Sequence, residues 1–455
     1  MNLSAVGIPR ALARSYDSGM DELFDLPPTE ADPAEPEPRG RPRLQRPQRD
    51  QITLRPSDLE SLLPADHRAR LVWAFVESLD LAAFHARIRA VEGHSGRPPI
   101  DPAILVSLWL YATLEGVGSA RALDRLCDEH DAYRWLCGGV GVNHHTLADF
   151  RVEQADLLDT LLVQSVAALL ATGEVSLSRV AHDGIRVRAA AGAASFRRRA
   201  TLERALAEAT AQVEALKREL DEDPSATSRR VTAARERAAS ERAERVRRAL
   251  EQLPALEAAK RRNRKPPEEA RASTTDPEAR VMRLGDGGYR PAYNGQYTTA
   301  TGSGLVVGVA VTNVGSDQGE LGPAVERVRA RYGRPPDEIL VDGGYVTLGE
   351  IDNVTACGTT VYAPPTTRPP RSEGSWRRPD SPAVADWRER MTAPHAQAIY
   401  RQRAASAEWV NALARNRGLQ QFRVRGREKV RSVLLWFALA HNLDRTLAIR
   451  AGTTG

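Results

Sequence analysis

The chain has 455 residues, 42% of them hydrophobic, which is enough for two or three domains with ordinary cores. A formal net charge of +5 is small beside 64 basic and 59 acidic residues, so the sum points only weakly to polyanionic partners. Three cysteines exclude a disulfide framework, no apolar run reaches the roughly 18 residues of a membrane span, and the N-terminus lacks a signal-peptide pattern, so we expect a cytoplasmic protein.

The first 175 residues divide into an arm and a helical region. Residues 1–54 are rich in Pro, Glu, Asp and Arg, which predicts a disordered arm. Residues 55–175 place apolar side chains at spacings of three and four, which predicts an all-α N-terminal domain. Within it, residues 116–138 are typical of a capped helix, a turn and a second helix, as in helix-turn-helix DNA binders. On pattern alone, an ordinary helical bundle is favoured over that alternative.

A strand and a long insertion follow. Residues 175–189 alternate and contain β-branched side chains, which predicts a strand. Residues 196–265 are rich in Ala, Arg, Glu and Leu, with a break at 221–227, and predict a coiled-coil-like helical hairpin inserted into the domain. Its many charges are most simply a solvated face. The expected apolar stripes of its two helices are Phe196, Leu202, Leu206, Val213, Leu216 and Leu220, then Val231, Val246, Leu250 and Leu253.

Alternating strands and helices complete the chain. The pattern predicts two or three strands over 289–314, a helix over 321–333, a strand over 337–345, a short helix over 347–358, a strand over 359–365, a Pro- and Arg-rich loop over 364–394, and helices over 395–418 and 427–449. Without the hairpin this order predicts a mixed α/β sheet, an antiparallel meander followed by right-handed crossovers. It is the element order of the RNase H-like fold.

Three acidic residues are candidates for chemistry. Asp183 and Asp342 each lie on or after an apolar strand and precede glycine, where an unpaired buried carboxylate would be unfavourable without a metal, a basic partner or a helix to cap. Glu408 lies on an expected helix, seven residues from both Arg401 and Arg415, so the three are expected to share a face. For each carboxylate a turn aspartate or a surface ion pair is the simpler alternative.

Four stretches together resemble a DDE transposase of insertion sequences, in the branch with a helical insertion after the first aspartate. They are AHDGIRVRA, STTDPEARVMRLGDGGYRPAYNGQYTTAT with VTNVGSDQGEL, ILVDGGYV, and YRQRAASAEWVNALARNRGLQQFRVRGREKV. The family's C-terminal signature is Tyr, Arg, Glu and Lys. Tyr400, Arg403 and Glu408 match it with one extra residue between Arg403 and Glu408, and Arg415 replaces the lysine.

The resemblance, which covers about residues 55–448, implies an RNase H-like catalytic domain over 176–450 whose catalytic and metal-binding residues are Asp183, Asp342 and Glu408. It implies two Mg²⁺ ions, with Mn²⁺ as a possible substitute, held by these carboxylates for in-line phosphodiester chemistry. It implies that Tyr400, Arg403 and Arg415 contact DNA near the cut.

Other residues are weaker candidates. Asp317 precedes a helix and is most simply its N-cap. Asp286 lies in a glycine-rich loop that the resemblance places near the site, without a role. The spacing of Cys127, Cys137, His144 and His145 matches no standard zinc finger. His182 is expected on the opposite face of its strand from Asp183, as a core residue.

The function expected from the resemblance is binding of the terminal inverted repeats of an insertion sequence, followed by metal-dependent strand cleavage and strand transfer. The partners are double-stranded DNA and a second copy of the chain in the active complex, in the cytoplasm at the nucleoid, with no membrane. Arginine clusters at 197–199, 261–264, 367–371 and 423–431 suit phosphates, although a GC-rich genome also favours arginine codons. The alternatives are an RNase H-like nuclease without strand transfer, a catalytically inactive DNA-binding repressor, and a coiled-coil scaffold.

Overall fold

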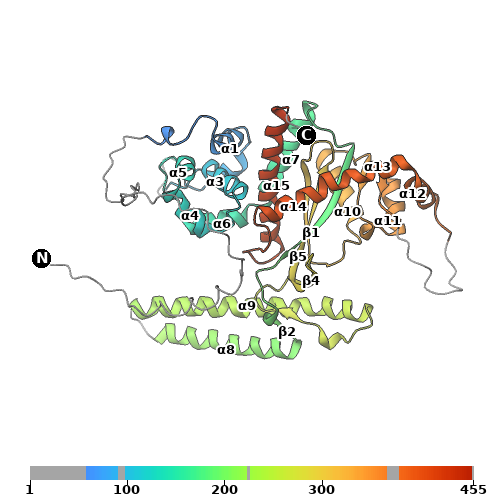
Figure 1. Cartoon of the computed structure of the whole chain (residues 1–455). Helices are drawn as coiled ribbons and strands as arrows, with labels where there is room; N and C mark the ends of the chain where they lie inside the picture. Colours follow the sequence, from blue (N-terminus) through green and yellow to red (C-terminus); the bar gives the residue numbers. More distant parts are fainter. Residues whose placement is uncertain (1–57, 91–97, 223–225, 366–378, 453–455) are drawn as a thin grey trace, which may run out of the picture. The chain divides into compact units, whose positions relative to one another are not determined.

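The computed structural model describes residues 58–90, 98–222, 226–365 and 379–452, so the expected arm at 1–54 lies outside the described residues (Figure 1). No single helix in these ranges is long and apolar enough to cross a membrane, although the helices His144–Glu153 and Ala155–Ala171, bent by 66° to each other, are so by length and composition when taken together.

The N-terminal part is helical, as the spacing predicted. Its helices begin at caps that the sequence supplies: the side chain of Asp101 accepts from the Ala103 amide at 2.8 Å with Pro102 at the first helical position, and Asn143 caps α6. The elements are η1 (Glu60–Leu62), α1 (Arg68–Glu77), α2 (Ala82–His85), α3 (Pro102–Leu114), α4 (Ala120–Glu129), α5 (Asp131–Cys137), α6 (His144–Glu153) and α7 (Ala155–Ala171).

One mixed sheet follows, in the strand order β4-β5-β1-β7-β8 with β6 also paired to β5. β1, β5 and β6 form an antiparallel meander, while β1, β7 and β8 run parallel, which is the arrangement that the element order predicted. β4, which pairs with β5, was not predicted from the sequence. The strands are β1 (Arg179–Arg188), β4 (Arg280–Arg283), β5 (Tyr289–Ala300), β6 (Val306–Thr312), β7 (Glu338–Leu340) and β8 (Thr360–Tyr362).

The segment between β1 and β4 contains two long helices, α8 (Arg199–Glu222) and α9 (Ala226–Arg262), which pack on each other (Figure 1). A two-stranded ribbon, β2 (Phe196–Arg197) with β3 (Ala272–Ser273), joins the start of α8 to the segment after α9, and η3 (Pro267–Glu269) precedes β3.

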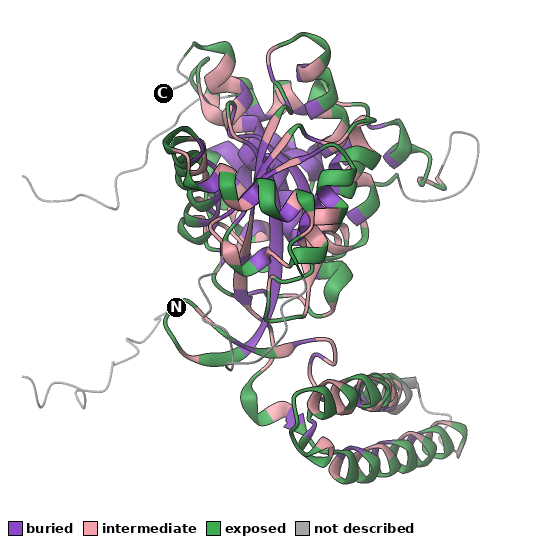
Figure 2. Ribbon diagram, turned by 90° about the vertical axis from the view of Figure 1, so that its right-hand side faces the viewer, coloured by how far each residue is buried: buried purple, intermediate pink, exposed green. Residues whose placement is uncertain are grey.

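Two residues of the insertion were assigned wrongly to the apolar stripes. Phe196 is buried in β2, before the helix begins, and Val231 is 52% exposed because α9 turns small residues such as Ala239 and Ala243 inward instead. Most of both helices is exposed in Figure 2.

Helices flank the parallel half of the sheet and close the chain. The expected loop over 364–394 is wrong in its second half, because Pro382–Thr392 forms α12, started by the Ser381 side chain that accepts from the Val384 amide; residues 366–378 lie outside the described ranges. The remaining elements are α10 (Leu321–Tyr332), η4 (Gly343–Tyr345), α11 (Leu348–Ala356), α13 (Pro394–Arg403), the π-helical η5 (Ala404–Glu408), α14 (Trp409–Asn416) and α15 (Arg427–Arg450).

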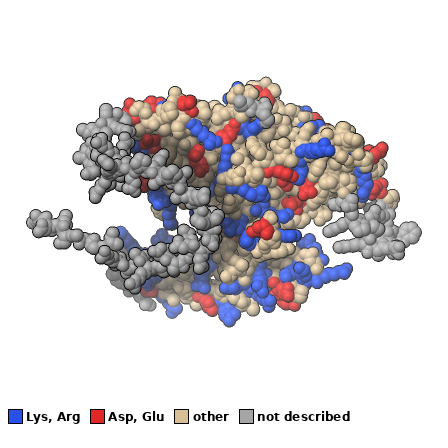
Figure 3. All heavy atoms as spheres, in the orientation of Figure 1, with Lys and Arg blue, Asp and Glu red and all other residues tan. Residues whose placement is uncertain are grey.

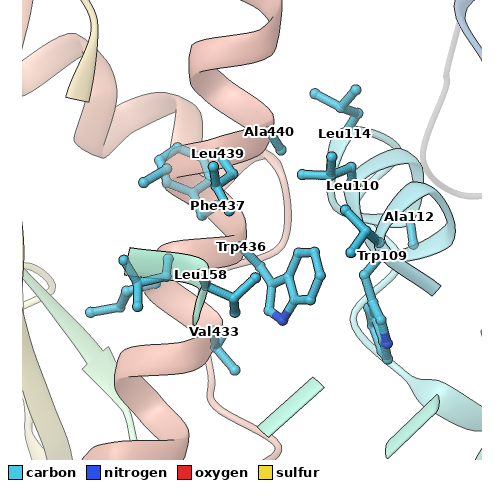
Figure 4. Close-up of a cluster of buried hydrophobic side chains, with 14 of the residues drawn as sticks. Trp109, Leu110, Ala112, Leu114, Leu158, Val433, Trp436, Phe437, Leu439 and Ala440 are labelled. Atoms are coloured by element: carbon cyan, nitrogen blue, oxygen red, sulfur yellow. The ribbon is translucent and has the colours of Figure 1, made fainter. Parts of the chain in front are cut away.

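The N-terminal helices and the last helix share one hydrophobic core. Figure 4 shows Trp109 and Leu110 of α3 facing Trp436 of α15, and Val433 and Phe437 of α15 belong to the same core. Both indole N–H groups find backbone acceptors at 3.0 Å, on Leu147 and Arg151 respectively, which leaves neither tryptophan with an unpaired donor. α15 therefore fixes the N-terminal helices against the sheet that carries the site.

Candidate active site

Partway along its length, β1 loses its parallel neighbour β7, which leaves one edge of β1 without a paired strand among the described residues. β7 pairs with β1 only over Arg179–Ala181 and then ends at Leu340, whereas β1 continues to Arg188 with β5 along its other edge. At the last residue of β1 a later segment of the chain lies against this edge, since the Phe422 amide donates to the Arg188 carbonyl at 2.8 Å. The stretch of β1 between these two points borders a cleft, at the carboxyl end of the parallel strands, where sites form in open α/β sheets.

Asp183 lies two residues beyond the last β1–β7 pair, with its side chain 21% exposed. Asn411 of α14 donates from Nδ2 to Asp183 Oδ2 at 3.1 Å, and the Gly184 amide donates to Oδ1 at 2.9 Å. Arg403 Nη1 lies 3.6 Å from Oδ2. Burial raises the pKa of Asp183 above its usual value, and the nearby guanidinium and hydrogen-bond donors only partly oppose this.

Asp342 follows the end of β7 and precedes η4. It is exposed, and its side chain makes no capping hydrogen bond to η4, so the carboxylate is not occupied by helix capping. The capping alternative that the sequence left open is therefore not what positions this residue. Its backbone is held by the hydrogen bond from the Tyr345 amide to the Asp342 carbonyl at 3.0 Å, and Gly344 has open space around its Cα.

Glu408 ends the π-helical turn η5, and this turn explains the extra residue after Arg403. Five residues of a regular α-helix would rotate Glu408 about 140° away from Arg403, whereas the i→i+5 turn leaves the two on the same side. Arg403 and Glu408 form an ion pair, with their side chains 13% and 48% exposed. The expectation that Arg401 shares a face with Glu408 was wrong, because it assumed an unbroken α-helix between them.

All three carboxylates line one open cleft of about 600 Å³, together with Arg403, Trp409, Asn411 and Arg415. A second hollow of about 910 Å³ shares Asp183, Asp342 and Arg415 and continues along β1. Its further lining is basic on β1 and at the β4–β5 turn, and consists of Arg186, Arg188 and Arg290 beside Asp286 and Asp317. Tyr400 lines neither hollow, and its ring lies under the Arg403 guanidinium at 5.8 Å.

The chemistry of this donor set fits a hard divalent cation. Three carboxylates on an open cleft offer the oxygen ligands that Mg²⁺ prefers and leave room for the waters that it retains. The geometry is not that of a closed site, since within the described ranges no three or more His, Cys, Asp or Glu side chains are close enough to hold an ion. What stands between Asp183 and Glu408 is the guanidinium of Arg403.

Asp317 was expected to cap a helix, and that expectation was wrong. The N-cap position of α10 is Glu320, while Asp317 accepts from Asn294 at 2.6 Å and Gln296 at 3.0 Å and pairs with Arg186 at 2.9 Å. These polar side chains lie directly behind Gly184. Sequence reasoning missed Asn294 and Gln296, although two amide side chains inside a strand as buried as β5 are a signal of a specific polar contact.

Asn411 was also missed, because nothing in a helical pattern distinguishes an asparagine that holds a carboxylate from an ordinary surface asparagine. It is buried, and besides Asp183 it donates to the Gly184 carbonyl at 3.4 Å.

The remaining candidates are placed as follows. His182 is fully buried on the opposite face from Asp183, as expected, with Nδ1 2.9 Å from Thr298 Oγ1, and burial lowers its pKa to about 3. Asp286 lines the second hollow and forms an ion pair with Arg290. Cys127 and Cys137 are buried free thiols on α4 and α5, and His144 faces Asp124 at 3.2 Å.

Comparison with known proteins gives two family matches in chain order. A model described as Transposase domain (DUF772) matches residues 57–153, and a model described as Transposase DDE domain matches residues 354–447. The second match contains Tyr400, Arg403, Glu408 and Arg415, whereas Asp183 and Asp342 lie outside both. Neither the search of curated proteins nor the search of solved structures found a match.

A DDE domain defines a metal-dependent enzyme that cuts and transfers DNA on an RNase H-like fold, and the strand order observed here agrees with that fold. Together with the transposase domain matched over the N-terminal helices, this match supports an insertion-sequence DDE transposase.

Proposed function

We propose that Asp183, Asp342 and Glu408 are the catalytic carboxylates, and that they hold two Mg²⁺ ions, for which Mn²⁺ can substitute. The observation that carries this proposal is the cleft that all three line, although they are separated by more than 60 residues of sequence in each case. Bound divalent ions would activate the attacking oxygen and stabilise the leaving oxygen of a phosphodiester.

The surroundings of each carboxylate suggest which of the two ions it would bind. Asp183 lies on β1, the central strand of the sheet, which suits a ligand that bridges both ions. Asn411 fixes one of its oxygens at 3.1 Å, so that the carboxylate is already oriented before substrate arrives. Asp342 and Glu408 are exposed, on a short turn and a helix, and each would complete one ion from its own side of the cleft.

DNA would enter along the basic hollow. Arg415 stands where both hollows meet, and Arg186, Arg188 and Arg290 continue the basic lining away from the carboxylates. Guanidinium groups of this kind contact phosphates and would hold the duplex without reading its sequence. Figure 3 shows many further Lys and Arg side chains on the face that it draws, interspersed with acidic ones. Tyr400, which lies beneath Arg403, supports that side chain rather than lining the cleft itself.

On this proposal residues 55–175 form the DNA-binding domain for the terminal inverted repeats, residues 176–450 form the catalytic domain, and the hairpin at 196–265 is an insertion in it. Water is the first nucleophile and cuts the end of the element, and the freed 3′-hydroxyl then attacks target DNA. Because two ends must be cut in concert, we expect two copies of the chain in the active complex.

The test is a cleavage assay on DNA carrying the element's inverted repeat, with Mg²⁺ or Mn²⁺, for the wild type and for Asp342→Asn. The matched control is Asp337→Asn, an exposed aspartate at the opposite end of β7, just before its first residue. We expect cutting by the wild type and the control but not by Asp342→Asn, and equal cutting by all three would remove Asp342 from the mechanism.

A pre-cut end tests the second half of the reaction. We expect the wild type to join its 3′-hydroxyl to a target duplex. Cleavage without joining would identify a nuclease that lacks strand transfer, and repeat-specific binding without either reaction would identify a repressor.

A further inference from the structure

Arg403 lies between two of the three carboxylates. Its Nη2 pairs with Glu408 Oε1, and its Nη1 lies 3.6 Å from Asp183 Oδ2. With 13% of its side chain exposed, it is the least exposed partner in both pairs. The π-helical turn makes this possible, because it turns Arg403 and Glu408 to the same side of the helix.

The contact has a direct consequence for ion binding, which depends on the proposed triad. A cation that joins Asp183 to Glu408 needs the oxygens that the guanidinium holds. Two positive charges at that place would also repel each other in a partly buried site. Arg403 and a divalent ion therefore compete for the same position.

A DNA phosphate is a partner that could draw Arg403 away during the reaction. A DNA phosphate offers two oxygens in the geometry that a guanidinium binds bidentately, and it arrives in this same cleft. Asn411 would keep Asp183 Oδ2 in place when the arginine leaves, because it approaches from α14 independently of Arg403. The Tyr400 ring, 5.8 Å from the guanidinium, already lies beneath the side chain and would stay within reach of it after the ion pairs break.

We propose that Arg403 is a positioning residue that couples DNA binding to ion binding: it holds Asp183 and Glu408 until a DNA phosphate takes the guanidinium, and only then can an ion bridge those two carboxylates. Ion binding that depends on Glu408 should consequently be weak in the free protein and strong in its DNA complex. Ion binding to Asp342 should depend little on DNA, because Arg403 forms no ion pair with that residue among the described contacts.

The test is a titration with Mn²⁺, followed by the loss of the free-ion signal in electron paramagnetic resonance, with and without a duplex that carries the inverted repeat. The variants are Arg403→Gln, which keeps length and removes charge, and Arg403→Lys, which keeps charge and removes the fork. Arg401→Gln, an exposed arginine two residues away, is the control.

Without DNA, Arg403→Gln should bind Mn²⁺ about tenfold more tightly than the wild type, an effect typical of removing one charge-assisted pair. Adding Glu408→Gln to that variant should abolish the gain. The Mn²⁺ affinity of Arg403→Lys should lie between those of the wild type and Arg403→Gln, and the affinity of Arg401→Gln should equal that of the wild type. A folded Arg403→Gln variant whose DNA-free affinity is unchanged would overturn the coupling.

The same titration separates this proposal from the proposed function. If Asp183→Asn and Glu408→Gln leave Mn²⁺ binding in the DNA complex unchanged, the triad itself is wrong. If they weaken it while Arg403→Gln has no effect without DNA, the triad stands and only the role of Arg403 fails.

Discussion

The close packing behind the first candidate carboxylate makes Gly184→Ala an informative substitution. A Cβ at this position would lie 2.8 Å from each of three side-chain atoms, Asn294 Oδ1, Gln296 Nε2 and Asp317 Oδ1. Real Cβ contacts essentially never come that close, so at least one neighbour must move. The backbone of β1 cannot yield easily, because Gly184 pairs with Gln296 in the middle of the sheet.

The magnitude follows from how these neighbours hold one another. Asp317 accepts from Asn294 at 2.6 Å, from Gln296 at 3.0 Å and from Arg186 at 2.9 Å, so moving any of them breaks a hydrogen bond to a carboxylate. Overpacking of this kind costs about 1–3 kcal/mol. A lost bond to a charged group adds about 1–2 kcal/mol after a discount for the partial exposure of Asp317. We expect Gly184→Ala to lower the free energy of unfolding by about 2–5 kcal/mol, the sum of the two effects.

The assay is urea unfolding followed by circular dichroism, with Gly349→Ala as the control. Gly349 lies in α11 with nothing within 4 Å of the place that an added methyl group would take, so alanine there should be neutral or stabilise by up to about 1 kcal/mol. If the two variants unfold at the same urea concentration, the tight packing behind Asp183 is refuted.

Two further predictions concern buried ionisable groups. His182 has its pKa lowered by burial to about 3 from the ordinary 6.5, so the unfolded chain binds a proton that the folded protein does not, and stability should fall as pH drops from about 6.5 toward 3 by up to about 1.4 kcal/mol per pH unit. In measurements of the unfolding free energy between pH 4 and 7, His182→Gln should show a shallower dependence on pH, reduced by the contribution of one proton. An unchanged slope would contradict the claim that His182 stays neutral in the folded protein. Asp159 pairs with Arg331 at 2.6 Å and Arg431 at 2.8 Å and is 18% exposed, so Asp159→Ala should lower the unfolding free energy by about 2–3 kcal/mol. Asp156, which also pairs with Arg431 but is 85% exposed, should change it by less than about 0.5 kcal/mol when replaced by alanine, and equal effects of the two would count against the pairing.

The order of strands and helices could be predicted from periodicity because the apolar patterns are strong and local. β1 and α10 lie within the segments that the sequence indicated, and α15 extends one residue past its segment. The elements that were missed depend on tertiary context. β4 is four residues long and exposes Val281, so only its pairing with β5 defines it. α12 follows a Pro- and Arg-rich stretch whose composition is typical of loops, and Ser381 with Pro382 was the overlooked start signal.

The candidate site shows a sharper limit. The glycine after each aspartate was visible in the sequence, and the resemblance supplied Glu408. No periodicity could predict that the extra residue before Glu408 is absorbed in a π-helical turn, because such a turn leaves no repeating pattern of apolar residues and is a single local irregularity in a helix. Likewise, Asp317 had a plausible local partner in the helix that follows it, and its real partners come from β1 and β5, far away in the sequence.

The most direct measurement of the central claim is the metal dependence of DNA cleavage by Asp342→Cys. Mg²⁺ takes oxygen ligands almost exclusively, whereas a transition-metal ion such as Mn²⁺ also accepts a thiolate. If Asp342 binds a catalytic ion, this variant should fail to cut inverted-repeat DNA with Mg²⁺ and should recover cutting with Mn²⁺, while Asp337→Cys should behave as the wild type with both. Equal cutting by Asp342→Cys with the two metals would contradict the claim that this carboxylate holds an ion at the scissile phosphate.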